Sequence, residues 1–152
     1  MDIGAGNSYP ACSLSNFSAH PFVLDGVECA SMEGFLQSLK FKSADMQKEV
    51  CKLVGRKAKF RGKSKNWRRT QTLYWQGQEI DRHSPEYQTL LDRAYDALGQ
   101  NKSFRCALEA SGDATLEHSI GKNKPNLTVL TVSEFTKRLY RLRERFKQDN
   151  RQ

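Results

Sequence analysis

The sequence predicts an α+β fold, with a single, mainly helical domain and a small β-hairpin or small sheet near the N-terminus. A chain of 152 residues is about the length of one domain and is long enough to bury one core. Two short apolar runs separated by Asp25-Gly26 indicate the hairpin, and apolar residues recur at helical spacing in later segments. The hydrophobic fraction of 38% and the charged fraction of 28% are typical of a globular protein.

The first regular element is expected to be the hairpin. Residues 1–13 are rich in Gly, Ser, Asn and Pro and are expected to form a loose N-terminal segment. Further along, Phe22–Leu24 and Val27–Cys29 flank Asp25-Gly26, a pair that tolerates the positive φ angles of a type I′ turn. The two runs are therefore predicted to pair as short antiparallel strands.

A polar stripe lies within the next apolar segment, which is predicted to form a helix over Ser31–Phe41. At about 100° per residue, Glu33, Gln37 and Lys40 share one face, about 10 Å long. Solvated surface groups are the common explanation of such spacing. The alternative is that the stripe places an acid, an amide and an amine in a pocket that acts on a sugar. Gly34 costs a helix about 1 kcal/mol relative to Ala, which favours close approach by a ligand or another backbone.

Four further helices are expected after this one. Their predicted ranges are 43–54, 84–98, 103–110 and a last helix capped by Ser133. Gly55 is expected to end the first of them, and Ser84 to cap the second. Residues 70–83 show no clear periodicity and are predicted to be part helix and part loop, while 128–130 are a brief strand or an extended lead. The tail, 148–152, is expected to fray.

Positive charge is concentrated in one segment of a chain whose net charge is +8. No Asp or Glu occurs from Val50 to Gln78, and the Lys and Arg residues there are Lys52, Arg56, Lys57, Lys59, Arg61, Lys63, Lys65, Arg68 and Arg69. Such a segment attracts phosphate, whether in nucleotides or in nucleic acid. The alternative is a solvated basic surface that keeps the protein in solution. Trp67 favours the first interpretation, because an indole among cations can stack on a base.

Cysteine usage and hydropathy limit the class of protein. The cysteines have no metal-ligand spacing; they are Cys12, Cys29, Cys51 and Cys106. No apolar stretch of signal-peptide length follows Met1, so a reducing, cytoplasmic location without a disulfide framework is expected. No apolar run approaches the roughly 18 to 20 residues that span a bilayer, which excludes membrane insertion. Neither a metal site nor the motifs of kinases and serine hydrolases are present.

Short motifs occur in a fixed order along the chain. They are Leu14–Phe17, Ser31–Phe41, Gly55-Arg56, Lys65–Trp67 and Leu116–His118. Together they resemble the NADAR family, named for its association with NAD and ADP-ribose, whose pattern is SNF, a hairpin, a T/S-x-E-x-x-x-Q-x-x-K-F helix, a GR turn and a following Trp. The resemblance covers about residues 14 to 145 and predicts a NADAR-like domain over 14–147.

The resemblance implies a compact, mainly helical α+β domain that hydrolyses the N-glycosidic bond between ribose and a base. The implied substrates are phosphorylated pyrimidine intermediates of riboflavin synthesis, and ADP-ribose joined to guanine in nucleotides or DNA. Glu33 matches the family's essential acid, Lys40 its essential lysine and Trp67 its substrate-contacting tryptophan. Asn16 and Phe17 match the motif at the pocket edge. No cofactor is implied, and the sequence predicts no particular oligomeric state.

These residue types suit the reaction. Positive charge builds on the ribose C1 as the base departs, so a group such as Glu33 has to move protons and steady the cation. The resemblance further implies that Lys40 captures C1 as a Schiff base, which requires a neutral amine; burial and nearby cations lower the pKa of Lys40 and favour that form. Gln37 matches a helix position facing the same pocket, and Arg56 with neighbouring lysines is expected to bind phosphate oxygens.

The sequence departs from the family pattern at one acid. Many members carry a Trp-Gly loop with a third functional acid after the Leu-Glu-His element, where this chain has His118–Asn123. Asp113 or Glu117 is a candidate replacement, although a carboxylate after a helix end is more often a cap or a surface charge. His118 itself could act as an acid or phosphate donor, or have a structural role. The alternative function is therefore a non-catalytic module that binds a nucleotide, ADP-ribose or nucleic acid.

Overall fold

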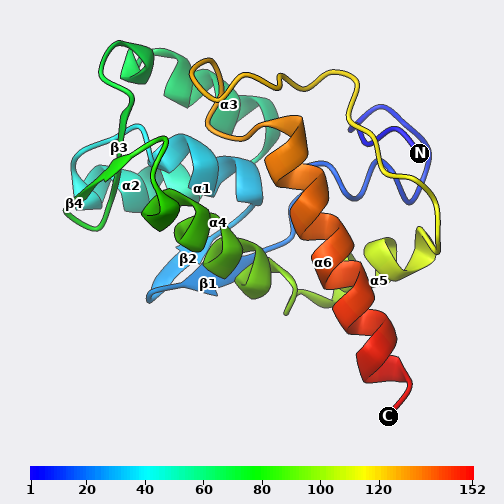
Figure 1. Ribbon diagram of the computed structural model, residues 1–152. Helices are drawn as coiled ribbons and strands as arrows, with labels where there is room; N and C mark the ends of the chain where they lie inside the picture. The colour runs from blue at the N-terminus through cyan, green and yellow to red at the C-terminus, as the bar shows by residue number, and fades with distance from the viewer.

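Six α-helices and two small antiparallel sheets form the protein in a computed structural model that describes residues 1–152 (Figure 1). The helices are α1 (Met32–Ser38), α2 (Ala44–Cys51), α3 (Gly55–Lys63), α4 (Pro85–Leu98), α5 (Lys102–Ala110) and α6 (Val132–Asn150). The strands are β1 (Phe22–Leu24), β2 (Val27–Cys29), β3 (Thr72–Trp75) and β4 (Gln78–Asp81), and a 3-10 turn, η1 (Trp67–Arg69), precedes β3. The predicted α+β class is confirmed.

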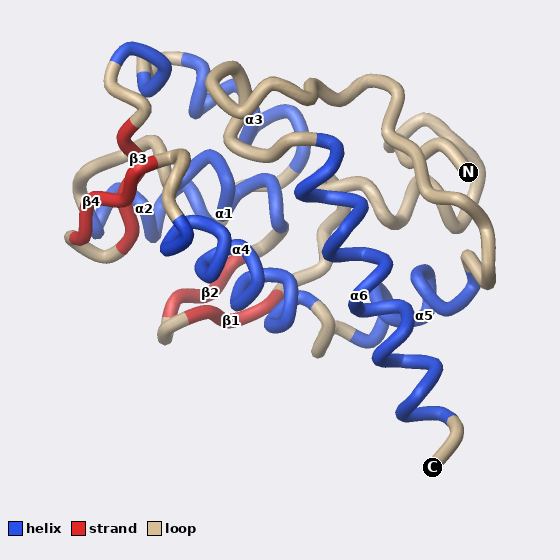
Figure 2. Tube along the Cα trace, viewed as in Figure 1, coloured by secondary structure: helices blue, strands red, loops and turns tan.

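The core is built around α1, which is the most buried helix. Phe35 is fully buried and lies edge-on to Trp75 of β3, with the ring centroids 5.1 Å apart. A cluster of 29 buried residues connects α1 to the hairpins and to α4, α5 and α6. In the view of Figure 2, both hairpins lie on the side of the molecule away from α5 and the C-terminal half of α6. None of the helices is both long and apolar enough to cross a lipid bilayer.

The predicted hairpin over Phe22–Cys29 is confirmed. Phe22 pairs with Cys29 and Leu24 with Val27, and all four side chains are buried on one face. Asp25 and Gly26 both adopt positive φ, as a type I′ turn requires.

The helix predicted over Ser31–Phe41 ends earlier, at Ser38. The Leu39 carbonyl accepts from Tyr74 N–H of β3, and the Ser38 carbonyl accepts from the Gln47 amide. These carbonyls bond to other elements, so the chain leaves the α-helix after two turns. Lys40 still follows in a tight turn, because its N–H donates to the Gln37 carbonyl three residues back.

Gly55 begins a helix instead of ending one. The second helix, α2, already ends at Cys51, and α3 starts at Gly55 within the basic segment. Hydrophobic periodicity could not reveal α3, because only Ala58 and Gly62 of its nine residues are buried, and neither contributes to a hydrophobic stripe.

The prediction of part helix and part loop for 70–83 is wrong. This segment forms the hairpin β3–β4, in which Thr72 pairs with Asp81. Its turn consists of Gln76 and Gly77, both at positive φ. A Gln-Gly pair is not among the strong hairpin signals, which explains why periodicity alone missed it.

The C-terminal half follows the predictions more closely. α4 is confirmed with Ser84 as its N-cap, and α5 covers the helix predicted over 103–110. Thr131, not Ser133, caps α6, because Thr131 and Glu134 form a reciprocal capping box. Residues 128–130 form no strand, and α6 continues to Asn150.

The N-terminal segment packs against the loop that follows α5. Ile3 is buried, and its N–H donates to the carbonyl of Glu117 over 2.8 Å. Asp2 accepts hydrogen bonds from the N–H and the hydroxyl of Ser119. These contacts fix the position of His118 between them.

Candidate functional site

A cavity of about 350 Å³ brings together seven of the eight predicted site residues. They are Asn16, Phe17, Glu33, Gln37, Lys40, Trp67 and His118. Much of the remaining wall comes from α3 and from the loop between His118 and α6, and Phe135 of α6 and Ala5 of the N-terminal segment contribute to it. Arg56 is the exception: it lies exposed on α3 and does not line the cavity.

Glu33 is placed in the first turn of α1 by two capping contacts. The Ser31 hydroxyl accepts from Gly34 N–H, and Glu33 N–H donates to the Asn16 carbonyl over 3.0 Å. One carboxylate oxygen of Glu33 accepts a hydrogen bond of 2.8 Å from the Gln37 amide, one turn further along. Burial raises the pKa of Glu33 above its usual value, although Gln37 and Lys40 oppose that shift.

Lys40 is half-buried at the other end of the polar stripe. Burial lowers its pKa to about 8, in spite of the opposing effect of the Glu33 carboxylate. The positive charges of Arg68, Lys59 and Lys122 contribute to this lowered pKa, after burial. At such a pKa roughly one amine in ten is neutral at pH 7, which is far more than for a free lysine. Lys40 is therefore suited to act as a nucleophile.

Two glycines allow α1 to approach its neighbours. A Cβ at Gly34 would come 2.5 Å from the Leu53 carbonyl, so the close approach expected there is to another backbone and not to a ligand. A Cβ at Gly62 of α3 would come 1.8 Å from Gln37 Oε1. The Gln37 oxygen is buried without a hydrogen-bond partner. The amide is therefore positioned by its N–H donation to Glu33 and by its packing against Gly62.

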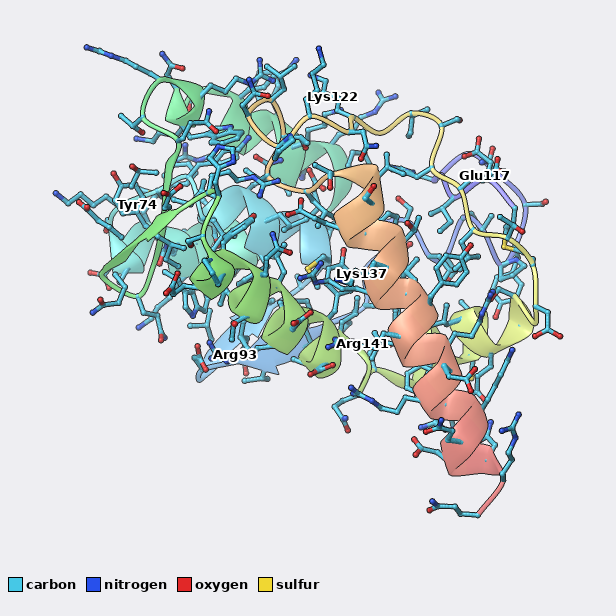
Figure 3. The ribbon with its side chains drawn as sticks, in the orientation of Figure 1. Tyr74, Arg93, Glu117, Lys122, Lys137 and Arg141 are labelled. Carbon is cyan, nitrogen blue, oxygen red and sulfur yellow. The ribbon has the colours of Figure 1, made fainter.

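The cavity is strongly cationic. Its basic side chains are Lys40, Lys59, Lys63, Arg68, His118 and Lys122, whereas Glu33 is the one carboxylate among the lining residues. Lys59 and Lys63 lie one turn apart on α3 and so present their amines on the same side. Lys122 belongs to the loop that precedes α6, as Figure 3 shows, and it too lines the cavity. The arrangement favours an anionic ligand such as a phosphate ester.

Sequence reasoning found the basic segment but not the residues that face the cavity. It named Arg56 of the Gly-Arg motif with neighbouring lysines that it did not specify, whereas Lys59, Lys63 and Lys122 line the cavity and Arg56 does not. The four-residue spacing of Lys59 and Lys63 would have been informative only if α3 had been predicted. Lys122 is brought in by tertiary contacts, and no local pattern marks it.

The remaining predicted residues form the walls. Asn16 is held from behind, because its side-chain oxygen accepts from the Tyr95 hydroxyl over 2.8 Å. Trp67 in η1 is almost fully buried, whereas Phe17 is partly exposed at the edge. Both rings line the cavity and are available to contact a base.

Neither candidate for the third acid reaches the cavity. Asp113 is exposed and forms an ion pair with Lys147 of α6. Glu117 is exposed beside the N-terminal segment (Figure 3), where its N–H donates to the Met1 carbonyl and its carbonyl accepts from Ile3 N–H. No group of three His, Cys, Asp or Glu side chains comes together in a way that could hold a metal ion.

Comparison with solved structures identifies the fold. The chain superposes on the NMR structure of the E. coli protein YbiA with a TM-score of 0.60, covering 97% of this chain and 84% of that one. YbiA is a NADAR family member, so the expected NADAR-like fold is confirmed. At 19% sequence identity, the likeness concerns the fold alone.

Comparison of sequences identifies the family. The chain is 41% identical over 150 residues to a protein of Enterobacteria phage T4, described as the uncharacterized 17.1 kDa protein in the Gp30-rIII intergenic region. The match covers 95% of this chain and 97% of the relative. The family model of bacteriophage protein GP30.3 matches residues 8–144. The chain therefore belongs to the bacteriophage protein GP30.3 family and has a NADAR-like fold.

Proposed function

We propose that this protein is an N-glycosidase that hydrolyses the bond between ribose and a base. The substrate is ADP-ribose joined to guanine, in a nucleotide or in DNA, or a phosphorylated ribosylamino-pyrimidine of riboflavin synthesis. The observation that carries the proposal is that Glu33 and Lys40 line one cationic cavity, where burial lowers the pKa of the Lys40 amine to about 8. An acid and an amine of reduced basicity are the two groups that Schiff-base chemistry at a sugar carbon needs.

In this reaction the neutral Lys40 amine attacks the ribose C1 and the bond to the base breaks. The Glu33 carboxylate, ionised and held by Gln37, accepts the proton that the new secondary ammonium has to lose. The same carboxyl group returns the proton to the ring oxygen as the sugar opens to the Schiff base. Water then hydrolyses the Schiff base and frees Lys40.

The cationic side of the cavity supplies the binding energy. Lys59, Lys63, Arg68 and Lys122 face a ligand that carries one or more phosphates. Phosphates bound there would hold the sugar beside Lys40, while Trp67 contacts the base.

The test is to incubate the purified protein with ADP-ribosylated guanosine and, separately, with the ribosylamino-pyrimidine phosphate, and to measure the released base by chromatography. We expect release from one of them, and loss of release in Glu33→Gln and Lys40→Ala. Borohydride added during turnover is expected to leave a mass adduct on Lys40. Lys57→Ala, on the exposed side of α3, is the matched control. Full activity in Glu33→Gln would contradict the acid/base role assigned to Glu33.

A non-catalytic module is the second candidate, and it is favoured by the presence of a single carboxylate in the cavity. Such a module would bind ADP-ribose or a nucleotide without releasing a base. Its affinity would fall steeply as the salt concentration rises, because phosphate contacts dominate the binding. Calorimetric titration of ADP-ribose beside the chromatographic assay separates the two functions.

A further inference from the structure

His118 is held on three sides, with one ring nitrogen left free. Its Nδ1 lies 2.8 Å from the Ile3 carbonyl, and its ring packs edge-on against Phe135 of α6, at a centroid distance of 5.3 Å. Gly121 closes the third side, since a Cβ there would come 2.5 Å from His118 Cδ2. Nε2 has no hydrogen-bond partner in the protein, although His118 lines the cavity.

The contact with Ile3 decides which nitrogen exchanges a proton. A backbone carbonyl can only accept, so Nδ1 carries a hydrogen whether the ring is neutral or charged. The proton that comes and goes is therefore the one on Nε2. A ring fixed in this way can deliver a proton into the cavity without changing its tautomer or its position.

The cavity otherwise lacks a second acid. Asp113 and Glu117 lie outside it, and Glu33 has to remain ionised to accept a proton from the Lys40 ammonium. The departing base nevertheless needs a proton of its own, because a purine or pyrimidine anion is a poor leaving group.

On the basis of the proposed N-glycosidase activity, we propose that His118 donates the Nε2 proton to the departing base, in place of the third acid of the NADAR pattern. As Lys40 Nζ bonds to the ribose C1, the electron pair of the C1–N bond passes to the base nitrogen, which takes the proton from Nε2. His118 is left neutral, with Nδ1–H still on Ile3. The water that later hydrolyses the Schiff base supplies the proton that recharges the ring.

The charges around His118 are mixed. The carboxylates close enough to interact with it electrostatically are Asp2 on the N-terminal segment and Glu33 on α1. The cations that share the cavity with it are Lys40, Lys59, Lys63, Arg68 and Lys122. On α6, Glu134 is turned to Arg82 and does not face the ring.

The test uses His118→Asn and two forms of one substrate. The asparagine amide can still donate to the Ile3 carbonyl but carries no exchangeable acid proton. The substrates are ADP-ribosylated guanosine and its N7-methyl form, in which the positively charged base leaves as a neutral molecule without a proton. We expect His118→Asn to slow single-turnover cleavage of the first by about 100-fold or more, and of the second by less than about threefold. His83→Asn, an exposed histidine outside the cavity, is the matched control.

An equal loss on both substrates would overturn the role of His118, because it would show a contribution to binding or folding instead of proton donation. The role of His118 is also overturned if the wild-type protein cleaves the first substrate but not the second, because a base that leaves without a proton should be released at least as easily. If the wild-type protein releases no product from either substrate, the N-glycosidase activity on ADP-ribosylated guanosine fails, and this inference fails with it. Lys40→Ala tests the proposed function separately from the role of His118. If the Schiff-base reaction occurs, this variant cleaves neither form of the substrate, whatever His118→Asn does.

Discussion

Gly62 of α3 lies so close to the side-chain amide of Gln37 on α1 that any larger residue at this position would displace the amide. A Cβ at Gly62 would come 1.8 Å from Gln37 Oε1 and 2.7 Å from Gln37 Cδ. The amide of Gln37 also donates to Glu33, so this contact connects the packing of α1 on α3 to the acid of the site.

Gly62→Ala is expected to damage the site more than the fold. The new methyl group forces the Gln37 amide to move, which breaks its hydrogen bond to Glu33 and raises the pKa of Glu33 further. Turnover should fall by about tenfold to a hundredfold, since a hydrogen bond to a charged group is worth about 1.5 to 3 kcal/mol. The free energy of unfolding should change little, because the higher helix propensity of Ala, about 1 kcal/mol, offsets part of the steric strain against Gln37. Carbon-13 NMR titration of the Glu33 carboxyl measures the shift.

Gly6→Ala and a double variant control this experiment. No atom lies within 4 Å of a Cβ at Gly6, so this substitution should change neither turnover nor the pKa of Glu33. In the background Gln37→Ala, the clash is absent and Gly62→Ala should stabilise the protein. An unchanged titration of Glu33 in Gly62→Ala would mean that the amide finds another position with the bond intact.

The reactivity of Lys40 is expected to follow the charge on Glu33. Burial lowers the pKa of Lys40 to about 8, and the Glu33 carboxylate limits this shift by favouring the ammonium. Glu33→Gln removes that charge, so the pKa of Lys40 should fall below about 8 and the amine should become reactive at lower pH. Acylation of Lys40 as a function of pH, followed by mass spectrometry of the peptide, measures the midpoint. Lys57 serves as the internal reference. A midpoint that moves to higher pH would contradict the proximity of the two groups.

Phosphate binding is expected to depend on one side of α3. Lys59 and Lys63 line the cavity, while Lys57 lies on the same helix outside it. Lys59→Ala and Lys63→Ala should each weaken the binding of ADP-ribose by about fivefold to tenfold and reduce its salt dependence, because each removes a cation that faces phosphate. Lys57→Ala should leave the affinity unchanged. Equal losses in all three variants would show that net charge, and not the cavity, determines the affinity.

The sequence allowed the polar stripe of α1 to be predicted because local geometry determines it. Glu33 and Gln37 are one helical turn apart, and Lys40 remains on their side because its N–H still bonds to the Gln37 carbonyl after the α-helix has ended. The error in the helix end therefore left the predicted stripe intact. All three residues line the cavity.

Other parts of the site depend on contacts that no local pattern encodes. The α3 helix packs through Ala58 and Gly62, which are too small to produce a recognisable hydrophobic periodicity. The sequence therefore could not show which of its lysines point toward the cavity. Lys122 comes from a loop placed by the start of α6, where its carbonyl accepts from Val132 N–H. The support of His118 by Ile3 joins residues separated by more than a hundred positions.

The wall of the cavity formed by residues 128–131 is expected to depend on a buried ion pair. Arg82, which is 1% exposed, donates to both carboxylate oxygens of Glu134 and to the Thr128 carbonyl, and Glu134 in turn accepts from Thr131 N–H. Burial alone would raise the pKa of Glu134, but the hydrogen bonds from Arg82, Thr131 and Gln88 hold it below its usual value. Glu134→Gln leaves Arg82 buried without its counter-ion and should lower the free energy of unfolding at pH 7 by about 3 kcal/mol.

The dependence of this effect on pH follows from the direction of the shift. A carboxyl group whose pKa is depressed by folding stabilises the protein above its unfolded pKa of about 4.3, and this contribution is lost as the pH falls through the folded value. The difference in stability between the wild-type protein and Glu134→Gln should therefore be largest near pH 7 and should shrink below about pH 4. Urea unfolding of both proteins at several pH values measures it. A difference that is constant down to pH 3 would mean that Glu134 contributes through its shape and its capping of α6, and not through its charge.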